Sequence, residues 1–190
     1  MEKKRVFLAF AIKLDRPLAD KIKQLQNKFS ANLIKWVSTD NFHVTLFFFG
    51  ELTAEQIDAL QKLLHEALNN STTFSFSVTG PGIFRNRKDP RVLWLDIEAS
   101  SQLINLKNQI NNTVIPLGFT SNDKRFHPHL TLGRFLPRQK NSSLLDNLLN
   151  EWQSTEQLEY TVRELVLFES KQTQTGVRYY PIDVFSLIPQ

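Results

Sequence analysis

The feature that most constrains how this chain can fold is a four-residue motif that occurs twice, at His43–Leu46 (HVTL) and at His129–Leu132 (HLTL). The two copies are 86 residues apart, and the same spacing relates three other pairs of residues: Arg5 and Arg91, Val6 and Val92, Phe49 and Phe135. Similarity at one fixed spacing indicates an internal duplication, and two copies are too few for a solenoid. We therefore expect one domain, residues 1–190, whose two similar halves span about 5–80 and 91–187.

Both copies of the motif lie in short apolar runs with the composition of β-strands, residues 42–49 and 128–136. Alternate residues of a strand point to the same face, so the histidine and the threonine of each copy share one face. The two aliphatic residues of each copy then face the core and anchor the strand. The chain has only four histidines, so this repeated pairing of an imidazole with a hydroxyl indicates a function.

In the first half, the spacing of apolar residues predicts the order strand, helix, histidine strand, helix, strand. Residues 5–12 form the opening strand, and the helix that follows carries an apolar stripe: Leu18, Ile22, Leu25 and Phe29. Gly50 is expected to end the histidine strand, and residues 53–56 (TAEQ) form a capping box for the second helix. Residues 73–79 alternate as a strand, after which Gly80–Gly82 (GPG) is expected to break the chain.

The second half is predicted to repeat this order after a basic loop at residues 85–91. Its expected elements are a strand at 92–97, a helix capped by Ser100 or Ser101, the second histidine strand, a Leu-rich helix from Ser142 or Ser143 to near Trp152, and strands at 160–168 and 177–187. Together the halves predict an α+β domain of two lobes. Duplicated motifs generally face each other across a pseudo-twofold axis, so the histidine strands are expected to line a cleft.

The composition excludes several classes of protein. There is no cysteine, which excludes disulfides, thiolate catalysis and cysteine metal sites. No apolar run approaches the roughly 20 residues of a membrane span, and the charged N-terminus lacks a cleavage site for secretion. We expect a cytoplasmic protein that does not associate with membranes and is a monomer. Its net charge of +4 fits an anionic partner.

Two imidazoles can divide the work of an acid and a base near neutral pH, because the side chain titrates there without further help. One neutral and one protonated histidine can deprotonate a nucleophile and protonate a leaving group. In-line displacement at phosphorus requires both steps. A threonine beside each imidazole supplies a hydrogen-bond donor for the non-bridging phosphate oxygens. The paired motifs therefore predict an enzyme that acts on phosphate esters.

The two motifs, with Phe47–Gly50 (FFFG) after the first and His127-Pro128 before the second, resemble the two-histidine phosphoesterase superfamily. Within it, the chain is most similar to the bacterial and archaeal RNA 2′,3′-cyclic phosphodiesterases, also described as tRNA 2′-5′ ligase-like proteins. The resemblance extends over nearly the whole chain, including Arg178–Pro181 (RYYP) near its end. It implies a bilobal fold of two antiparallel sheets, with the helices on the outside, and hydrolysis of 2′,3′-cyclic phosphates to 2′-phosphates without a metal or another cofactor.

The resemblance also implies a role for each residue of the two motifs. His43 would donate a proton to the leaving 3′ oxygen, and His129 would activate water as the base. Thr45 and Thr131 would bind the phosphate of the substrate. The residues themselves do not distinguish the acid from the base, because the two motifs are nearly identical, so this assignment depends on the resemblance alone.

Two further positions raise a problem of strand geometry. Arg134 matches a position of the family that reaches the phosphate, but it has the opposite parity from His129. It reaches the same face only if the strand twists or bulges near Gly133. Phe48 has the same problem relative to the first motif, so packing in the core is expected for it more than stacking on a base of the substrate.

The remaining histidines and basic segments are assigned less specific roles. His127 shares the strand face of His129 and is expected at the rim of the site, whereas His65 is expected on the surface of its helix. The basic loop at 85–91, together with Lys124-Arg125, is expected either to contact RNA phosphates or to be a solvated surface.

Three alternatives remain open from the sequence. The first is a zinc site formed by His43, His127 and His129, although the two threonines would then have no role. The second is a non-catalytic module that binds RNA or a nucleotide. The third is an enzyme of the same superfamily with another reaction or substrate, such as cleavage of 2′-5′ oligonucleotides, 2′-5′ RNA ligation, or hydrolysis of an ADP-ribose cyclic phosphate.

Overall fold

The architecture is that of a computed structural model, which describes residues 2–28, 33–87, 89–120, 126–136, 158–174 and 176–190. Its elements are, in chain order, β1 (Lys4–Ala11), α1 (Arg16–Lys28), β2 (Ile34–Trp36), η1 (Thr39–Asn41), β3 (His43–Leu52), α2 (Ala54–Leu68), β4 (Phe74–Asn86), β5 (Asp89–Glu98), α3 (Ser101–Val114), η2 (Ile115–Leu117), β6 (His129–Phe135), β7 (Leu158–Val162), β8 (Glu164–Thr173) and β9 (Gly176–Ser186). The Leu-rich helix expected from Ser142 or Ser143 to Trp152 and the basic pair Lys124-Arg125 lie outside the described residues.

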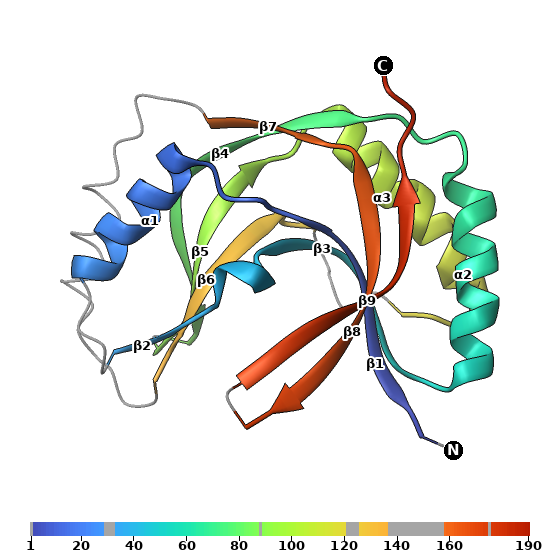
Figure 1. Cartoon of the computed structure of the whole chain (residues 1–190), viewed down its shortest axis with the longest axis horizontal. Helices are drawn as coiled ribbons and strands as arrows, with labels where there is room; N and C mark the ends of the chain where they lie inside the picture. The colour runs from blue at the N-terminus through green and yellow to red at the C-terminus, as the bar shows by residue number, and fades with distance from the viewer. Residues whose placement is uncertain (1, 29–32, 88, 121–125, 137–157, 175) are drawn as a thin grey trace.

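The strands form two sheets, as Figure 1 shows. Sheet one has the strand order β3-β1-β8-β9, and sheet two has the order β2-β6-β5-β4-β7. All neighbouring strands in both sheets are antiparallel. The expected α+β fold with two antiparallel sheets is therefore confirmed, and one histidine strand belongs to each sheet. These two strands, β3 and β6, contact each other.

The sheets exchange strands between the two halves of the chain. Each histidine strand pairs with the opening strand of its own half, β3 with β1 and β6 with β5. The next strand of each sheet comes from the other half, because β8 pairs with β1 and β4 pairs with β5. Neither sheet is thus built from one half alone, an arrangement that the spacing of the repeat does not reveal.

Each histidine strand contains a bulge at the leucine of its motif. In sheet one, Thr45 is opposite Ala9 and Phe47 is opposite Leu8, which leaves Leu46 as the extra residue on β3. In sheet two, the register jumps in the same way between Thr131 and Gly133, which leaves Leu132 as the extra residue on β6. An extra residue on one strand shifts the alternation of faces beyond it by one position.

The bulges decide where Phe48 and Arg134 point. The extra residue of each bulge and the residue after it, Leu46 with Phe47 and Leu132 with Gly133, are all buried. Phe48 is 40% exposed and Arg134 is also exposed, as expected if both lie on the face of the histidine and threonine. The bulge that the parity of Arg134 requires is therefore present, and the expectation that Phe48 packs in the core is wrong.

Helices α2 and α3 begin where the sequence predicts. Thr53 and Gln56 form the reciprocal capping box at the start of α2, and Ser100 is the residue that caps α3. The oxygen of Asp15 accepts a hydrogen bond from the backbone of Leu18 in the first turn of α1. Each helix buries one apolar stripe and exposes its other side. The stripe expected for α1 is confirmed at Leu18, Ile22 and Leu25. Phe29 lies outside the described residues.

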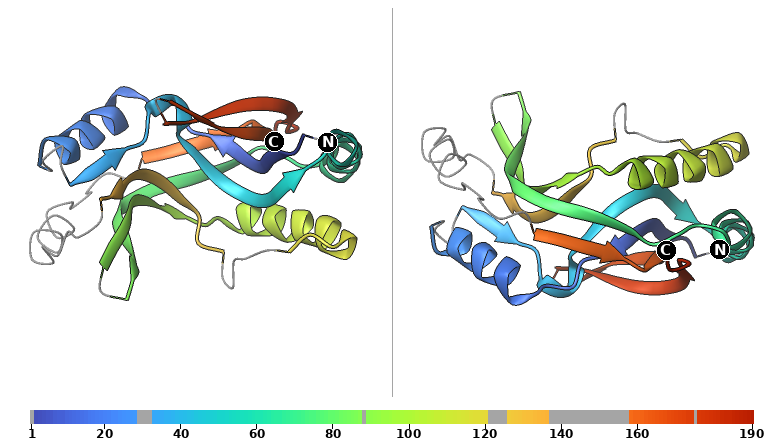
Figure 2. Two further views of the ribbon diagram at one scale, coloured as in Figure 1. Left: turned by 90° about the horizontal axis from the view of Figure 1, so that it is seen from below. Right: turned by 90° about the horizontal axis from the view of Figure 1, so that it is seen from above.

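Helices α2 and α3 contact each other at the opposite end of the molecule from α1, as Figures 1 and 2 show. No helix in the described ranges is long and apolar enough to cross a bilayer.

Two expected chain breaks are wrong. Gly50 has a left-handed φ of +83°, yet β3 continues to Leu52 because Gly50 still pairs with Val6. Strand β4 also continues through Gly80–Gly82 (GPG) to Asn86. A proline has no N–H for a sheet, but β7 pairs with β4 only as far as Val78. Pro81 thus lies at a register irregularity and beyond the reach of β7, where a missing donor is tolerated.

Two other segments also differ from expectation. The basic loop at 85–91 is instead the tip of a hairpin, because β4 reaches Asn86 and β5 begins at Asp89. The strand expected at 160–168 is divided between the sheets, since β7 ends at Val162 and β8 starts at Glu164. Strand β2 was not predicted, because three residues are too few to show a period.

Candidate active site

The imidazole of His43 is oriented by the backbone of its own strand. Its Nδ1 lies 2.7 Å from the carbonyl oxygen of Asn41, two residues earlier. A carbonyl oxygen can only accept a hydrogen bond, so Nδ1 carries the proton and donates it. Proton exchange with a substrate then falls to Nε2.

The second motif repeats this arrangement. The Nδ1 atom of His129 lies 2.8 Å from the carbonyl oxygen of His127, again two residues earlier. Both imidazoles are therefore held in the same tautomer by the same kind of contact. An acidic side chain is a frequent partner of a catalytic histidine, but here a main-chain carbonyl replaces it. The sequence could not show this partner, because every residue has a carbonyl.

The two histidines lie within electrostatic reach of each other. Burial lowers the pKa of His43 below its usual value, the hydrogen bond to the Asn41 carbonyl opposes this, and the charge of His129 lowers the pKa further. The neutral form of His43 is thus favoured in the protein without a ligand. The contact between β3 and β6 brings together the two residues that the sequence singled out.

Aromatic rings surround each imidazole. The ring of His43 lies 5.0 Å from that of Phe7 and 4.9 Å from that of Tyr179, which meets it edge-on. The ring of His129 lies 4.8 Å from that of Phe84 and 6.0 Å from that of Trp94. These rings restrict the rotation of both histidines and supply flat apolar surfaces beside them.

Thr45, Thr131, Phe48 and Arg134 share the faces that carry the histidines. Thr45 is exposed and Thr131 is half-buried, so a hydroxyl lies beside each imidazole. The guanidinium of Arg5 lies 4.7 Å above the ring of Phe48. Phe48 therefore presents a ring covered in part by a cation, next to the first motif.

Arg134 lies near the first histidine as well as the second. Burial raises the pKa of Tyr179, and the charges of Arg134 and Arg5 oppose this effect. Both guanidiniums therefore lie within electrostatic reach of the Tyr179 hydroxyl, whose ring contacts His43. Two positive charges and one hydroxyl thus gather beside the histidines, as a site for an anion requires.

His127 lies beside the second motif, as the sequence predicted. Its ring is 6.3 Å from that of His129 and 4.8 Å from that of Trp94. Its Nε2 faces the carboxylate of Asp96 at 3.3 Å. In the part of the chain that the structure describes, no three side chains of His, Asp or Glu come together closely enough to hold a metal ion.

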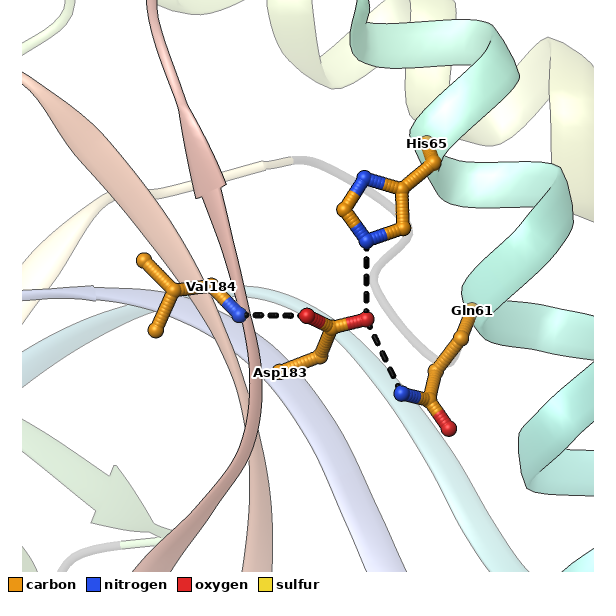
Figure 3. Close-up of polar contacts among 4 residues, drawn as sticks. All are labelled: Gln61, His65, Asp183 and Val184. Atoms are coloured by element: carbon orange, nitrogen blue, oxygen red, sulfur yellow. Dashed lines mark hydrogen bonds and ion pairs between the residues drawn. The ribbon is translucent and has the colours of Figure 1, made fainter.

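His65 lies on a different part of the molecule, in α2. Its side chain is 56% exposed, yet its Nε2 contacts the carboxylate of Asp183 at 2.9 Å. The same oxygen of Asp183 accepts a hydrogen bond from Gln61, and the other oxygen accepts one from the backbone of Val184, as Figure 3 shows. His65 is thus a surface residue, as expected, which also links α2 to β9.

Several residues around the histidines were not found by sequence reasoning. They are Arg5, Phe7, Phe84, Trp94, Asp96 and Tyr179. Phe7 and Trp94 occupy strands that the sequence predicted, but a large ring on a strand is usually a core residue. Tyr179 lies in the RYYP segment that contributed to the resemblance, so that segment is the sequence signal that could have identified Tyr179 as a residue of the site.

Comparison with known proteins identifies the family. The model of the 2′-5′ RNA ligase superfamily matches residues 14–174. A protein of Methanothermobacter thermautotrophicus named RNA 2′,3′-cyclic phosphodiesterase is 30% identical over 187 residues, which cover 97% of this chain and 100% of that protein. A protein of the same name from Archaeoglobus fulgidus is 31% identical over 179 residues, covering 94% of this chain and 98% of that protein.

Solved structures agree with this result. The structure of E. coli LigT complexed with 3′-AMP has a TM-score of 0.72 and 27% sequence identity, and the match covers 98% of this chain and 99% of that one. The superfamily model covers most of the sequence and the relatives match it nearly from end to end. This chain therefore belongs to the 2′-5′ RNA ligase superfamily.

Proposed function

We propose that this protein hydrolyses the 2′,3′-cyclic phosphate at an RNA end to a 2′-phosphate, with His43 and His129 as a metal-independent acid–base pair. The observation that carries the proposal is the matched orientation of the two imidazoles on strands that contact each other. The relatives named RNA 2′,3′-cyclic phosphodiesterase support the choice of substrate.

The reaction balances with these two groups. Nε2 of neutral His129 accepts a proton from water, whose oxygen forms a bond to phosphorus. The bond from phosphorus to the 3′ oxygen breaks on the opposite side, and Nε2 of protonated His43 donates a proton to that oxygen. The hydroxyls of Thr45 and Thr131 and the guanidinium of Arg134 bind the non-bridging oxygens and stabilise the charge that develops on them.

The environment of His43 adds a condition to this assignment. Burial lowers the pKa of His43, so the acid that the mechanism needs is not favoured in the protein without a ligand. A cyclic phosphate carries a negative charge, which favours the protonated imidazole beside it. We therefore propose that His43 gains its proton together with the substrate.

The test is an assay of RNA oligonucleotides that end in a 2′,3′-cyclic phosphate, with identification of the product isomer. His43→Ala and His129→Ala should each lower kcat by at least ~10²-fold, as is typical of acid–base catalysis. The double variant should be little worse than the worse single variant, because the two residues act as a unit. A non-catalytic binding module would show no turnover in the wild type.

Two controls separate this mechanism from a zinc site. Activity should survive exhaustive treatment with a chelator, and His127→Ala should retain most of it. The dependence of kcat/KM on pH should be bell-shaped, because one imidazole must be protonated and the other neutral. Activity that is lost on chelation, restored by zinc and absent from His127→Ala would contradict the proposal.

Ligation is the second candidate, and the name of the superfamily favours it. A 5′-hydroxyl of a second RNA would replace water as the nucleophile, with the same two histidines. Adding such an acceptor to the assay tests it, and a joined 2′-5′ product would establish it.

We also propose that residues 1–190 act as a single-domain cytoplasmic monomer with duplicated halves at about 5–80 and 91–187. Light scattering tests the monomer, and cell fractionation tests the location.

A further inference from the structure

In each motif, one backbone carbonyl lies outside the regular hydrogen-bond ladder of the sheet. A bulge disrupts the ladder of hydrogen bonds around its extra residue, and the extra residues here are Leu46 and Leu132. Both leucines are fully buried, so a donor other than water must satisfy each carbonyl. The position of that donor helps to fix the strand on which a catalytic histidine stands.

The two motifs obtain this donor from different sources. The carbonyl oxygen of Leu132 accepts a hydrogen bond from the backbone N–H of Val37 at 2.9 Å, directly after β2. Strand β2 covers the outer edge of β6, whereas β3 is the edge strand of sheet one in the part of the chain that the structure describes. The carbonyl oxygen of Leu46 instead accepts a hydrogen bond from the ammonium of Lys107 in α3, at 2.6 Å.

Lys107 occupies an unusual place for a lysine. It is 3% exposed and lies in the buried stripe of α3, whose other members are all aliphatic: Leu103, Leu106, Ile110 and Val114. Burial of an ammonium is unfavourable unless other groups compensate for the lost water. An apolar side chain would continue the stripe without that cost, so packing alone does not account for a lysine here.

The ammonium of Lys107 contacts segments that lead to both histidines. It lies 5.0 Å from the ring centroid of Phe47, next to the first motif, and 5.4 Å from that of Phe126. Phe126 comes three residues before His129. Cations over aromatic rings are attracted to them, more strongly where water is excluded. One ammonium therefore contacts both the bulge of the first motif and the segment that precedes the second motif.

We propose that Lys107 is a positioning residue of the active site, whose ammonium fixes the Leu46 bulge and sets the placement of the first histidine strand relative to the second. It does not touch the substrate. The inference depends on the proposed function for its consequence in catalysis, because a small misplacement of reacting groups lowers the rate steeply. Its consequence for the geometry of the two histidines does not depend on any activity.

The test replaces the ammonium by an uncharged group of similar length. Lys107→Met should lower kcat by on the order of 10- to 100-fold with little change in KM, as misplaced catalytic groups do. Lys107→Arg keeps a cationic donor and should recover part of the loss. Ile110→Ala is the matched control, because it lies on the same buried face of α3 and should lower the melting temperature without a comparable loss of kcat.

A second readout needs no substrate. NMR titration of the imidazoles measures how far the charge of His129 lowers the pKa of His43, and this coupling should shrink in Lys107→Met but persist in Ile110→Ala. If the wild type turns over no cyclic phosphate, the proposed function fails while this measurement still decides the role of Lys107. If Lys107→Met does not fold, Lys107→Gln, which is as long as methionine and uncharged, is expected to show the same losses. Wild-type kcat and wild-type coupling in the folded variant would overturn the proposal.

Discussion

Replacement of Gly82 by alanine should displace the indole of Trp94 and disturb the second histidine. The two residues are opposite each other in β4 and β5. A Cβ atom at position 82 would overlap three atoms of the six-membered ring of Trp94, closer than real Cβ contacts occur. The indole is rigid and the Cβ is fixed to the backbone, so the ring must move away.

The cost can be estimated from what Trp94 contacts. Its ring packs against those of Phe84 at 4.9 Å and His127 at 4.8 Å, and aromatic pairs of this kind contribute about 0.5–1.5 kcal/mol each. Forcing an extra carbon into a packed site typically costs about 1–3 kcal/mol. Alanine recovers about 0.4–1 kcal/mol through the unfolded chain. We expect a net loss of about 2 kcal/mol, which lowers Tm by about 4–8 °C in a chain of this size.

The assay is urea and thermal unfolding in two backgrounds. Trp94→Phe lacks Cζ2 and Cη2, the two ring atoms nearest to the new Cβ, so Gly82→Ala should cost about 1 kcal/mol less in that background. A coupling of this size between two substitutions is diagnostic of direct contact. Gly82→Ala should also reduce turnover, since the displaced indole lies against His129 and His127. An equal loss of stability in both backgrounds would refute the steric explanation.

The charges of His43, Asp183 and the 85–91 hairpin can each be tested directly. NMR titration should find the pKa of His43 below its usual value, and inorganic phosphate should raise it. Burial raises the pKa of Asp183, but hydrogen bonds from Gln61, Val184 and His65 outweigh this effect and lower the pKa overall. The resulting contribution to stability is present above the unfolded-state pKa of about 3.9 and is lost as the pH falls below it. Asp183→Asn should therefore flatten the acid limb of a curve of stability against pH. Arg85, Arg87 and Lys88 can be replaced together by serine. This change should lower the activity on RNA and reduce the salt dependence of that activity, but it should spare the hydrolysis of a mononucleoside cyclic phosphate.

The sequence predicted features whose signal is local. Alternation located the histidine strands, and the spacing of hydroxyl and amide side chains located the caps of α2 and α3. The pairing of His43 with His129 could also be anticipated, because a duplicated motif implies a symmetric arrangement. The strands and caps depend on residues close together in the chain, whereas the pairing of the histidines was inferred from the repeat.

The features that were missed depend on partners distant in the chain. Gly80–Gly82 reads as a break, but the partner strands determine that β4 continues through it. The division between β7 and β8 at Arg163 is set by pairing with two different sheets. For Arg134, the sequence showed that a bulge was needed near Gly133, but only the register between β5 and β6 shows that the bulge is present. The local pattern of apolar and polar residues does not reveal these pairings.

The exchange of strands between the halves has a consequence for synthesis. Proteins leave the ribosome N-terminus first and fold in that order, so β1 and β3 emerge together with the first histidine. Their sheet is complete only when β8 and β9 follow, at Glu164–Thr173 and Gly176–Ser186. Until then, the open edge of β1 can pair with other chains. The ring of Tyr179 reaches His43 only with this last part of the chain, so a nascent or truncated protein holds an incomplete site.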